Sequence, residues 1–203
     1  MAKSSQRWLD RQRRDPFVKQ AKLEDRRSRA VYKLEEIDRQ DRLFLPGMTV
    51  VDLGAAPGSW SEYALERVGA NGKVVAVDLL EMNPIDNLLF IKGDFTDLEI
   101  MDKCQQLFVK HGVDLVISDI APNLSGIKSA DQARCMHIAE CVLEFSQQVL
   151  NQGGTLLTKM FQGQGVDAYK KEFSDKFQKV VIRKPSASRD KSSEFYLLGK
   201  GFR

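Results

Sequence analysis

A lysine lies inside an apolar stretch near the end of a predicted strand. Lys159 stands between Leu156–Leu157 and Met160–Phe161, where an unpaired charge would be costly. Burial removes water from the side chain and favours the neutral amine over the ammonium. A neutral amine could accept the proton of a hydroxyl nucleophile, whereas a lysine that stays charged could stabilise a developing alkoxide. The position favours a functional lysine and leaves both roles open.

Aspartates fall at the ends of four successive predicted strands, namely Asp52, Asp78, Asp94 and Asp119. The carboxyl ends of parallel strands form one edge of a sheet, and ligands bind in the crevice outside that edge. A carboxylate at Asp78 can accept both ribose hydroxyls of an adenosine, and Asp94 could face the adenine amino group. The four aspartates together therefore predict a nucleoside site.

The first predicted strand ends in a loop of small residues that could approach a ligand closely. Its sequence, Asp-Leu-Gly-Ala-Ala-Pro-Gly-Ser-Trp over 52–60, places Gly54 and Gly58 four residues apart and is not Gly-x-Gly-x-x-Gly. Pro57 removes one backbone amide that a pyrophosphate would need. The loop therefore favours a cofactor without a diphosphate, and S-adenosylmethionine fits because it combines adenosine with a positively charged sulfonium amino acid.

The elements that would position these residues alternate between strands and helices. Strands are expected at 48–54, 73–79, 87–94, 113–122, 153–161, 179–185 and 193–200. Helices are expected at 27–40, where Ser28 is a candidate N-cap, and at 59–69, 97–110, 129–150 and 166–177. This alternation is typical of an α/β fold with a parallel sheet.

The two last predicted strands are separated by only the seven residues 186–192, too few for a crossover helix. They must therefore pair antiparallel. A mostly parallel seven-stranded sheet with a C-terminal antiparallel hairpin is the outline of the Rossmann-like S-adenosylmethionine-dependent methyltransferases. A nicotinamide dehydrogenase would continue with parallel units, and Pro57 and the missing glycine pattern also disfavour it.

Composition is that of a globular chain, with 203 residues, 42% hydrophobic and 29% charged. We expect one domain over 1–203 with a basic N-terminal arm at 1–26. Three cysteines without a Cys-x-x-Cys pair and two histidines argue against disulfides and a metal site. No apolar run is long enough for a membrane span and the N-terminus has no apolar signal core, so we expect a cytoplasmic protein.

Charge is distributed unevenly along the chain. Residues 1–33 carry 11 Lys/Arg against 4 Asp/Glu, residues 34–169 carry 10 against 20, and residues 170–203 carry 10 against 4. Two basic ends around an acidic middle favour a polyanionic partner such as RNA. The expected RNA contacts are Arg7, Arg11, Arg26, Arg27, Arg29, Lys184 and Arg189, with Arg13, Arg14 and Lys191 nearby. Trp8 and Phe17 could stack on bases or pack in the core.

The chain closely resembles the FtsJ/RrmJ family of ribosomal RNA 2′-O-ribose methyltransferases in the motifs VDLGAAPGSWSEY, DLLEMNPI, GDF, SDIAPNLSG, KMFQG and RKPSASRDKSSEFYLLGKG. The resemblance runs from Arg7 to Gly201. It implies a Lys-Asp-Lys-Glu tetrad for methyl transfer, formed by Lys33, Asp119, Lys159 and Glu194. It also implies cofactor contacts at Gly58, Trp60, Asp78, Asp94 and Asp119. The one departure is Ser59, where bacterial members carry glycine.

The implied function is methyl transfer from S-adenosylmethionine to the ribose 2′-hydroxyl of a uridine in 23S ribosomal RNA, on the assembled 50S subunit. We expect a monomer, because the sequence has no evident coiled coil or large amphipathic surplus. Two alternatives remain, namely a transfer RNA substrate and a ribosome-assembly factor of low turnover. Other methylations fit less well. Cytosine C5 methylation needs a cysteine next to proline, and amino-group methylation prefers Asp/Asn-Pro-Pro-aromatic, whereas the chain has Asp-Ile-Ala-Pro at 119–122.

Overall fold

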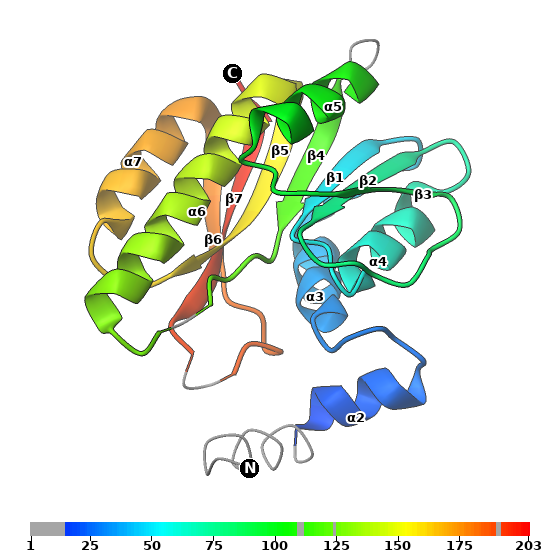
Figure 1. The fold of residues 1–203 in the computed structure, drawn as a ribbon, viewed down its shortest axis with the longest axis horizontal. Coiled ribbons are helices and arrows are strands. Elements are labelled where there is room, and N and C mark those ends of the chain that lie inside the picture. The colour runs from blue at the N-terminus through cyan, green and yellow to red at the C-terminus, as the bar shows by residue number, and fades with distance from the viewer. Residues whose placement is uncertain (1–14, 109–111, 124, 190–191) are drawn as a thin grey trace.

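The computed structural model describes residues 15–108, 112–123, 125–189 and 192–203. Its centre is one seven-stranded sheet in the order β3-β2-β1-β4-β5-β7-β6 (Figure 1). The strands are β1 Thr49–Leu53, β2 Lys73–Asp78, β3 Leu88–Lys92, β4 Val113–Ser118, β5 Leu150–Phe161, β6 Phe177–Arg183 and β7 Glu194–Phe202. The helices are α2 Pro16–Leu23, α3 Val31–Asp41, α4 Ser59–Val68, α5 Leu98–Phe108, α6 Lys128–Val149 and α7 Val166–Lys176.

Strand pairing confirms the expected fold class. Strands β1 to β5 pair in parallel, and β7 lies between β5 and β6 and runs antiparallel to both. The short connection between β6 and β7 dictates this arrangement, because it leaves no room for a crossover helix. The carboxyl ends of β4 and β5 therefore meet the beginning of β7 at one edge of the sheet.

Helices cover both faces of the sheet (Figure 1). On one face α5, α6 and α7 pack around a core that includes Val51, Leu156 and Phe173. On the other face α3 and α4 pack around Val50, Trp60 and other apolar residues. Neighbouring residues of β1 thus point into different cores, as the two-residue period of a strand requires.

Part of the predicted arm is a helix. Asp15 caps α2 by accepting the Phe17 N–H at 3.0 Å, and Pro16 occupies the first turn. Ala21 of α2 is buried in a small third core with Val31 and Ala187. Sequence reasoning missed this helix because its stabilising partner, Ala187, is remote in the chain. Residues 1–14 of the predicted arm lie outside the described residues.

Two predicted boundaries differ most from the structure. The helix expected at 27–40 begins at Val31, and its N-cap is Ala30 rather than Ser28. The Ser28 hydroxyl instead accepts the Ala30 N–H at 3.2 Å and lies 2.8 Å from the Ser59 hydroxyl. The fourth strand ends at Ser118 rather than at Pro122, so Asp119 stands just beyond it. Within the described segments, no helix combines the length and the apolar character of a membrane span.

Candidate active site

Four elements bring the predicted Lys-Asp-Lys-Glu tetrad together at the edge where β4 and β5 end. Lys33 lies in the first turn of α3, and Asp119 directly follows β4. Lys159 lies near the end of β5, and Glu194 begins β7. The register of β5 and β7 pairs Lys159 with Tyr196, which places a tyrosine opposite the second lysine. Residues far apart in the sequence thus meet because strands β4, β5 and β7 are neighbours.

Asp119 is the centre of this cluster. Its Oδ1 lies 2.8 Å from the Lys159 Nζ and 3.7 Å from the Lys33 Nζ. Lys33 also pairs with the Glu194 Oε1 at 2.9 Å. The side chains of Lys33 and Lys159 are only 10% and 7% exposed, so both ammonium groups need these carboxylates. Two lysines and two acids balance one another in charge, which makes their burial tolerable.

Tyr196 is a member of the cluster that sequence reasoning missed. Its hydroxyl donates to the Asp119 Oδ1 at 2.5 Å, and its ring lies 5.7 Å from the Lys33 Nζ. Burial, followed by the charge of Asp119 and the hydrogen bond to it, raises the pKa of Tyr196 well above its ordinary value. The phenol therefore stays neutral and keeps its proton for Asp119. A signal was present, because Tyr196 stands two residues after Glu194 and so shares its strand face.

Glu194 remains ionised despite its burial. Burial alone would raise the pKa of this carboxyl, but the Lys33 ammonium opposes it by charge and by hydrogen bonding. The hydroxyl of Ser188 and the charge of Lys159 act in the same direction, and the net effect lowers the pKa. Glu194 thus holds Lys33 as a charged partner beside Asp119.

A cavity of about 470 Å³ adjoins the tetrad along the carboxyl ends of β1, β2, β3 and β4. Of the residues predicted to bind the cofactor, Gly54, Asp78, Asp94 and Asp119 line it. Leu79 and Leu80, both more than half exposed, form an apolar part of its wall. The volume is that of a small-molecule site. We call it the cofactor cavity.

Backbone amides hold the acidic side chains of the cofactor cavity in place. The Asp78 carboxylate accepts the N–H of Ala56 at 2.8 Å and of Leu80 at 2.7 Å. The Asp94 Oδ1 accepts both the N–H and the hydroxyl of Thr96. No lysine or arginine lines this cavity among the described residues. Asp119 is paired with Lys159 and Lys33, but Asp78 and Asp94 make no ion pair among the described residues, and these two carboxylates suit a cationic nucleoside rather than a phosphate.

Gly54 satisfies a steric requirement at the same cavity. Its φ is +76°, and a Cβ at this position would lie 2.1 Å from the Cγ1 of Ile120. Ile120 itself lines the cavity, so a side chain at Gly54 would push this wall into the ligand space. The glycine thus allows the loop at 52–60 to lie close to Ile120, the residue that follows Asp119.

Gly58 and Trp60, the two other predicted cofactor residues, do not line the cavity. Gly58 is the N-cap of α4. The Trp60 ring is buried, and its Nε1 donates to the Ala30 carbonyl at 2.8 Å. A cofactor contact at Trp60 would therefore have to come from its backbone N–H, which lies in the first turn of α4 and lacks an intrahelical acceptor.

Asp52, the first of the four strand-end aspartates, is buried below the cofactor loop. Its Oδ2 accepts the Ser61 hydroxyl at 2.6 Å. Burial, with smaller contributions from the charges of Asp119 and Asp78, raises the pKa of Asp52 to about 7. It lies outside the cofactor cavity, so it fixes β1 to α4 rather than facing a ligand.

The predicted RNA contacts of the 26–29 segment have partners within the chain. Arg26 pairs with Glu66 at 2.7 Å, and Arg27 donates to the carbonyls of Asn83 and Pro84 at 3.0 and 2.9 Å. Arg29 binds both Asp15 and the Ala187 carbonyl. These three side chains reach Glu66 of α4, the connection between β2 and β3, the Asp15 cap of α2 and the β6–β7 connection, and their role toward RNA stays a prediction.

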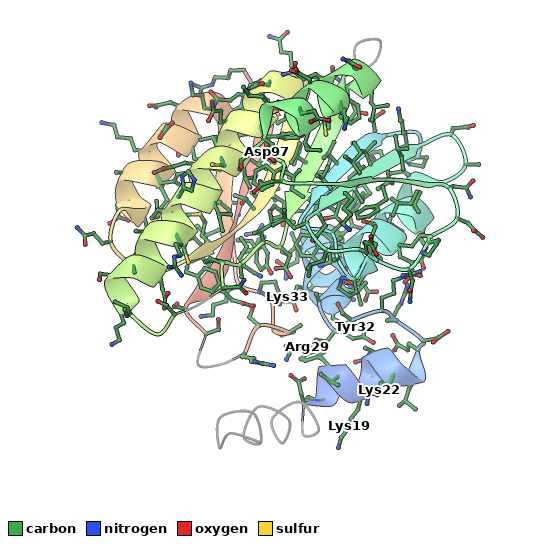
Figure 2. All side chains as sticks on the ribbon, in the orientation of Figure 1. Lys19, Lys22, Arg29, Tyr32, Lys33 and Asp97 are labelled. Atoms are coloured by element: carbon green, nitrogen blue, oxygen red, sulfur yellow. The ribbon has the colours of Figure 1, made fainter. Side chains whose placement is uncertain are left out.

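The other predicted RNA contacts are more open. Lys184 donates to the Ser192 carbonyl at 3.1 Å, and Arg189 is 45% exposed. Arg29 and Lys33 line a cavity of about 250 Å³ together with Arg189 and Glu194, and Figure 2 shows Arg29 and Lys33 between the sheet and α2. Arg7, Arg11, Arg13, Arg14, Trp8 and Lys191 lie outside the described residues.

Comparisons with known proteins agree on one family. Residues 26–202 match the model of the FtsJ-like methyltransferases. The chain is 51% identical over 202 residues to the ribosomal RNA large subunit methyltransferase E of Xanthomonas campestris, covering all of this chain and 96% of that protein. It is 50% identical to the protein of the same name from Pseudomonas aeruginosa PAO1, covering 98% of it.

Solved structures give the same fold. A Plasmodium falciparum protein described as a ribosomal RNA methyltransferase superposes with a TM-score of 0.79 at 31% identity, over 87% of this chain and 98% of that one. Fibrillarin of Aeropyrum pernix, solved with bound S-adenosylmethionine, superposes with a TM-score of 0.57 at 16% identity, over 83% and 75%. The second similarity concerns the fold alone.

Proposed function

The chain belongs to the FtsJ-like methyltransferase family, and on that basis we propose that it methylates ribosomal RNA of the large subunit with S-adenosylmethionine as the methyl donor. Within this activity, we propose that the acceptor is the ribose 2′-oxygen of a uridine. The observation that carries the proposal is the position of the Lys159–Asp119 pair, which borders the cofactor cavity on one side and Lys33 and Glu194 on the other.

The cofactor cavity fits the proposed donor. When bound, S-adenosylmethionine supplies an electrophilic methyl group on a positively charged sulfur. Asp78, which is held by two backbone amides, offers a carboxylate to ribose hydroxyls. Leu79 and Leu80 offer apolar contact to an adenine ring. Asp78 and Asp94 contribute the negative charge of the cavity wall and thereby favour a cationic ligand.

Lys159 acts in this proposal as a charged hydrogen-bond donor. Its Nζ already contacts two acceptors of one residue, the Oδ1 and the backbone oxygen of Asp119. An ammonium has three N–H groups, so one remains for the ribose oxygen. A fixed donor at that oxygen orients its lone pair and stabilises negative charge as it develops. Alignment of the nucleophile contributes the rest of the rate enhancement.

Asp119 can receive the ribose proton at its second oxygen. The side-chain contacts of Asp119 with Lys33, Lys159 and Tyr196 all use Oδ1, so Oδ2 has no partner among the described residues. A hydroxyl becomes strongly acidic once its oxygen begins to form a new bond, and a weak base then suffices. Lys33, fixed by Glu194 at 2.9 Å, lies 3.7 Å from the Asp119 Oδ1 and holds this carboxylate in place.

The residues favour an oxygen acceptor over the other methylation chemistries. None of the three cysteines neighbours a proline, as cytosine C5 methylation would require. The segment at 119–122, Asp-Ile-Ala-Pro, lacks the aromatic residue that stacks on a flipped base during amino-group methylation. A lysine fixed beside a carboxylate instead suits a hydroxyl that must lose a proton.

The finer features of the proposal concern the physiological substrate. We propose that a monomer acts in the cytoplasm on the assembled 50S subunit. The names of the relatives that match over nearly their whole length support a large-subunit RNA. The exposed Arg189 and the cavity lined by Arg29, Lys33 and Arg189 support a contact with its phosphates.

Transfer of labelled methyl groups tests the substrate. Undermethylated large subunits, the same RNA freed of protein, and unmodified transfer RNA would be compared with wild type and Lys159→Ala. The proposal expects label on intact subunits and none with the variant. Label on protein-free RNA alone would contradict the proposal that the assembled subunit is the substrate. Label on transfer RNA would show that the enzyme methylates another RNA. Cofactor binding without any label would instead support an assembly factor.

A further inference from the structure

Two cavities flank the tetrad, and neither shares a lining residue with the cofactor cavity. The smaller, of about 250 Å³, lies between the beginning of α3 and the β6–β7 connection and contains Arg29, Lys33 and Arg189. The larger, of about 760 Å³, lies between the first half of α6 and the end of β5. Its walls include Phe161, Gln132, Gln162 and Ser193. We call the larger one the base cavity.

We propose that the base cavity holds the unpaired nucleobase of the methylated nucleotide and determines which base is accepted. The proposal rests on the ribose methylation proposed above. It adds a binding site that the tetrad and the cofactor cavity do not contain.

Continuity with the tetrad is the first support. Phe161 follows Lys159 by two positions on β5, so both project from the same face of the strand, and the Lys159 Nζ lies 6.0 Å from the Phe161 ring centre. Ser193 directly precedes Glu194, and its carbonyl accepts the Gln162 N–H at 2.9 Å. The wall of the base cavity is thus adjacent to the tetrad residues Lys159 and Glu194. The base of a nucleotide is bonded to the carbon next to C2′, so it must enter a space that borders the tetrad.

The chemistry of the walls is the second support. Phe161 is half-buried and offers an aromatic face for base stacking. Gln162 is exposed and its side-chain amide has no partner among the described residues. A glutamine amide both donates and accepts, as the edge of a pyrimidine requires. Gln132 is held by its donation to the Gln164 carbonyl at 3.0 Å, which stiffens the wall behind Gln162.

The charges of the two cavities assign the orientation of the nucleotide. The smaller cavity contains Arg29, Arg189 and Lys33 against one carboxylate, Glu194, so its excess of positive charge suits a phosphate. The base cavity contains Lys128 and Asp131, and the Asp131 carboxylate is bound to Ser125 and Gly126. The phosphate therefore belongs on the α3 side and the base on the α6 side, with the ribose across Asp119 and Lys159.

The test compares large subunits that differ in one base, with the methylated uridine replaced by cytidine. Wild type should prefer uridine. In Gln162→Ala the ratio of kcat/KM for uridine over cytidine should fall roughly tenfold, because a base-edge hydrogen bond is lost. In Phe161→Leu the KM for both subunits should rise roughly tenfold, because stacking is lost. The KM for S-adenosylmethionine should stay unchanged in both variants.

Gln106→Ala is the matched control, because Gln106 is an exposed glutamine of α5, outside every cavity described above. It should behave as wild type. An unchanged base preference in Gln162→Ala would overturn the proposal and leave ribose methylation standing, and an unchanged subunit KM in Phe161→Leu would contradict base stacking on Phe161. If wild type labels no RNA, the function proposed above fails instead. Gln162 is exposed, so its variant carries the test even if Phe161→Leu folds poorly.

Discussion

Lys159 and Asp119 contact each other twice, once through the ion pair of Nζ and Oδ1 at 2.8 Å and once through donation from Nζ to the Asp119 backbone oxygen at 2.7 Å. The two residues are 40 positions apart in the sequence and meet because β4 and β5 are parallel neighbours. A side chain held by both the carboxylate and the backbone of its partner has one orientation. This pair therefore fixes the proposed catalytic amine beside the cofactor cavity.

Removal of the Lys159 amine should abolish methyl transfer without abolishing cofactor binding. Lys159 does not line the cofactor cavity. We expect kcat of Lys159→Ala to fall roughly 10²–10³-fold or more, as on loss of one charge-stabilising donor, with the dissociation constant of S-adenosylmethionine within about threefold of wild type. Single-turnover kinetics and equilibrium dialysis measure the two quantities. A variant with kcat within tenfold of wild type would contradict the proposed role.

Tyr196→Phe should lower kcat with little effect on either KM. The variant removes the hydrogen bond to the Asp119 Oδ1 and keeps the ring that packs against Trp60. A hydrogen bond to a charged group contributes about 1.5–3 kcal/mol, so we expect a decrease of at least roughly tenfold. Steady-state kinetics with both substrates checks this. A large rise in the KM for S-adenosylmethionine would instead indicate a role in cofactor binding.

Gly54→Ala should weaken cofactor binding far more than Gly47→Ala. Both glycines have positive φ values, +76° and +85°, so both variants suffer the same kind of backbone strain. Only at Gly54 does the new Cβ meet the Ile120 side chain, whereas nothing lies within 4 Å at Gly47. We expect at least a tenfold higher dissociation constant for Gly54→Ala alone, measured by calorimetry. Equal losses of cofactor affinity in the two variants would show that backbone strain, and not the contact with Ile120, weakens binding.

Asp52 should make the protein less stable as the pH rises from about 4 to 7. Its pKa is raised by burial to about 7 in the folded chain, from 3.8. The native state therefore binds more protons than the unfolded state in this interval, so the free energy of unfolding falls with pH. The full penalty, roughly 4 kcal/mol, is present above pH 7.

Asp52→Asn removes this pH dependence, because the amide stays neutral and can still accept the Ser61 hydroxyl. The advantage of the variant over wild type in urea unfolding should grow between pH 5 and pH 8. If the free energy of unfolding changes with pH in the same way for the two proteins, the pKa of Asp52 is not raised by folding and this prediction is wrong.

The fold and the unusual position of Lys159 could be predicted from the sequence because local signals carry them. Apolar runs, loop lengths and the short 186–192 connection determine the strands and the antiparallel hairpin. Lys159 stood out as a charge in an apolar strand. Lys33 and Glu194 stand in ordinary polar surroundings, and only the motifs shared with the family indicated them.

Features that depend on contacts between remote segments could not be predicted. Helix α2 is stabilised by Ala187 and Arg29, so its own sequence looked like an arm. The arginines at 26, 27 and 29 looked free for RNA, but each binds an acceptor brought close by folding. Tyr196 was not identified as a site residue from the sequence, because only the pairing of β5 with β7 places its hydroxyl on Asp119.

The most direct test of the central claim is the position of the transferred methyl group. Undermethylated large subunits would be treated with wild type and labelled S-adenosylmethionine, and the RNA digested to nucleosides for mass spectrometry. We predict one labelled product, 2′-O-methyluridine, which resists alkaline cleavage at that residue and is absent with Lys159→Ala. A label on a nucleobase, or an unchanged label with Lys159→Ala, would contradict the account of ribose methylation by this tetrad.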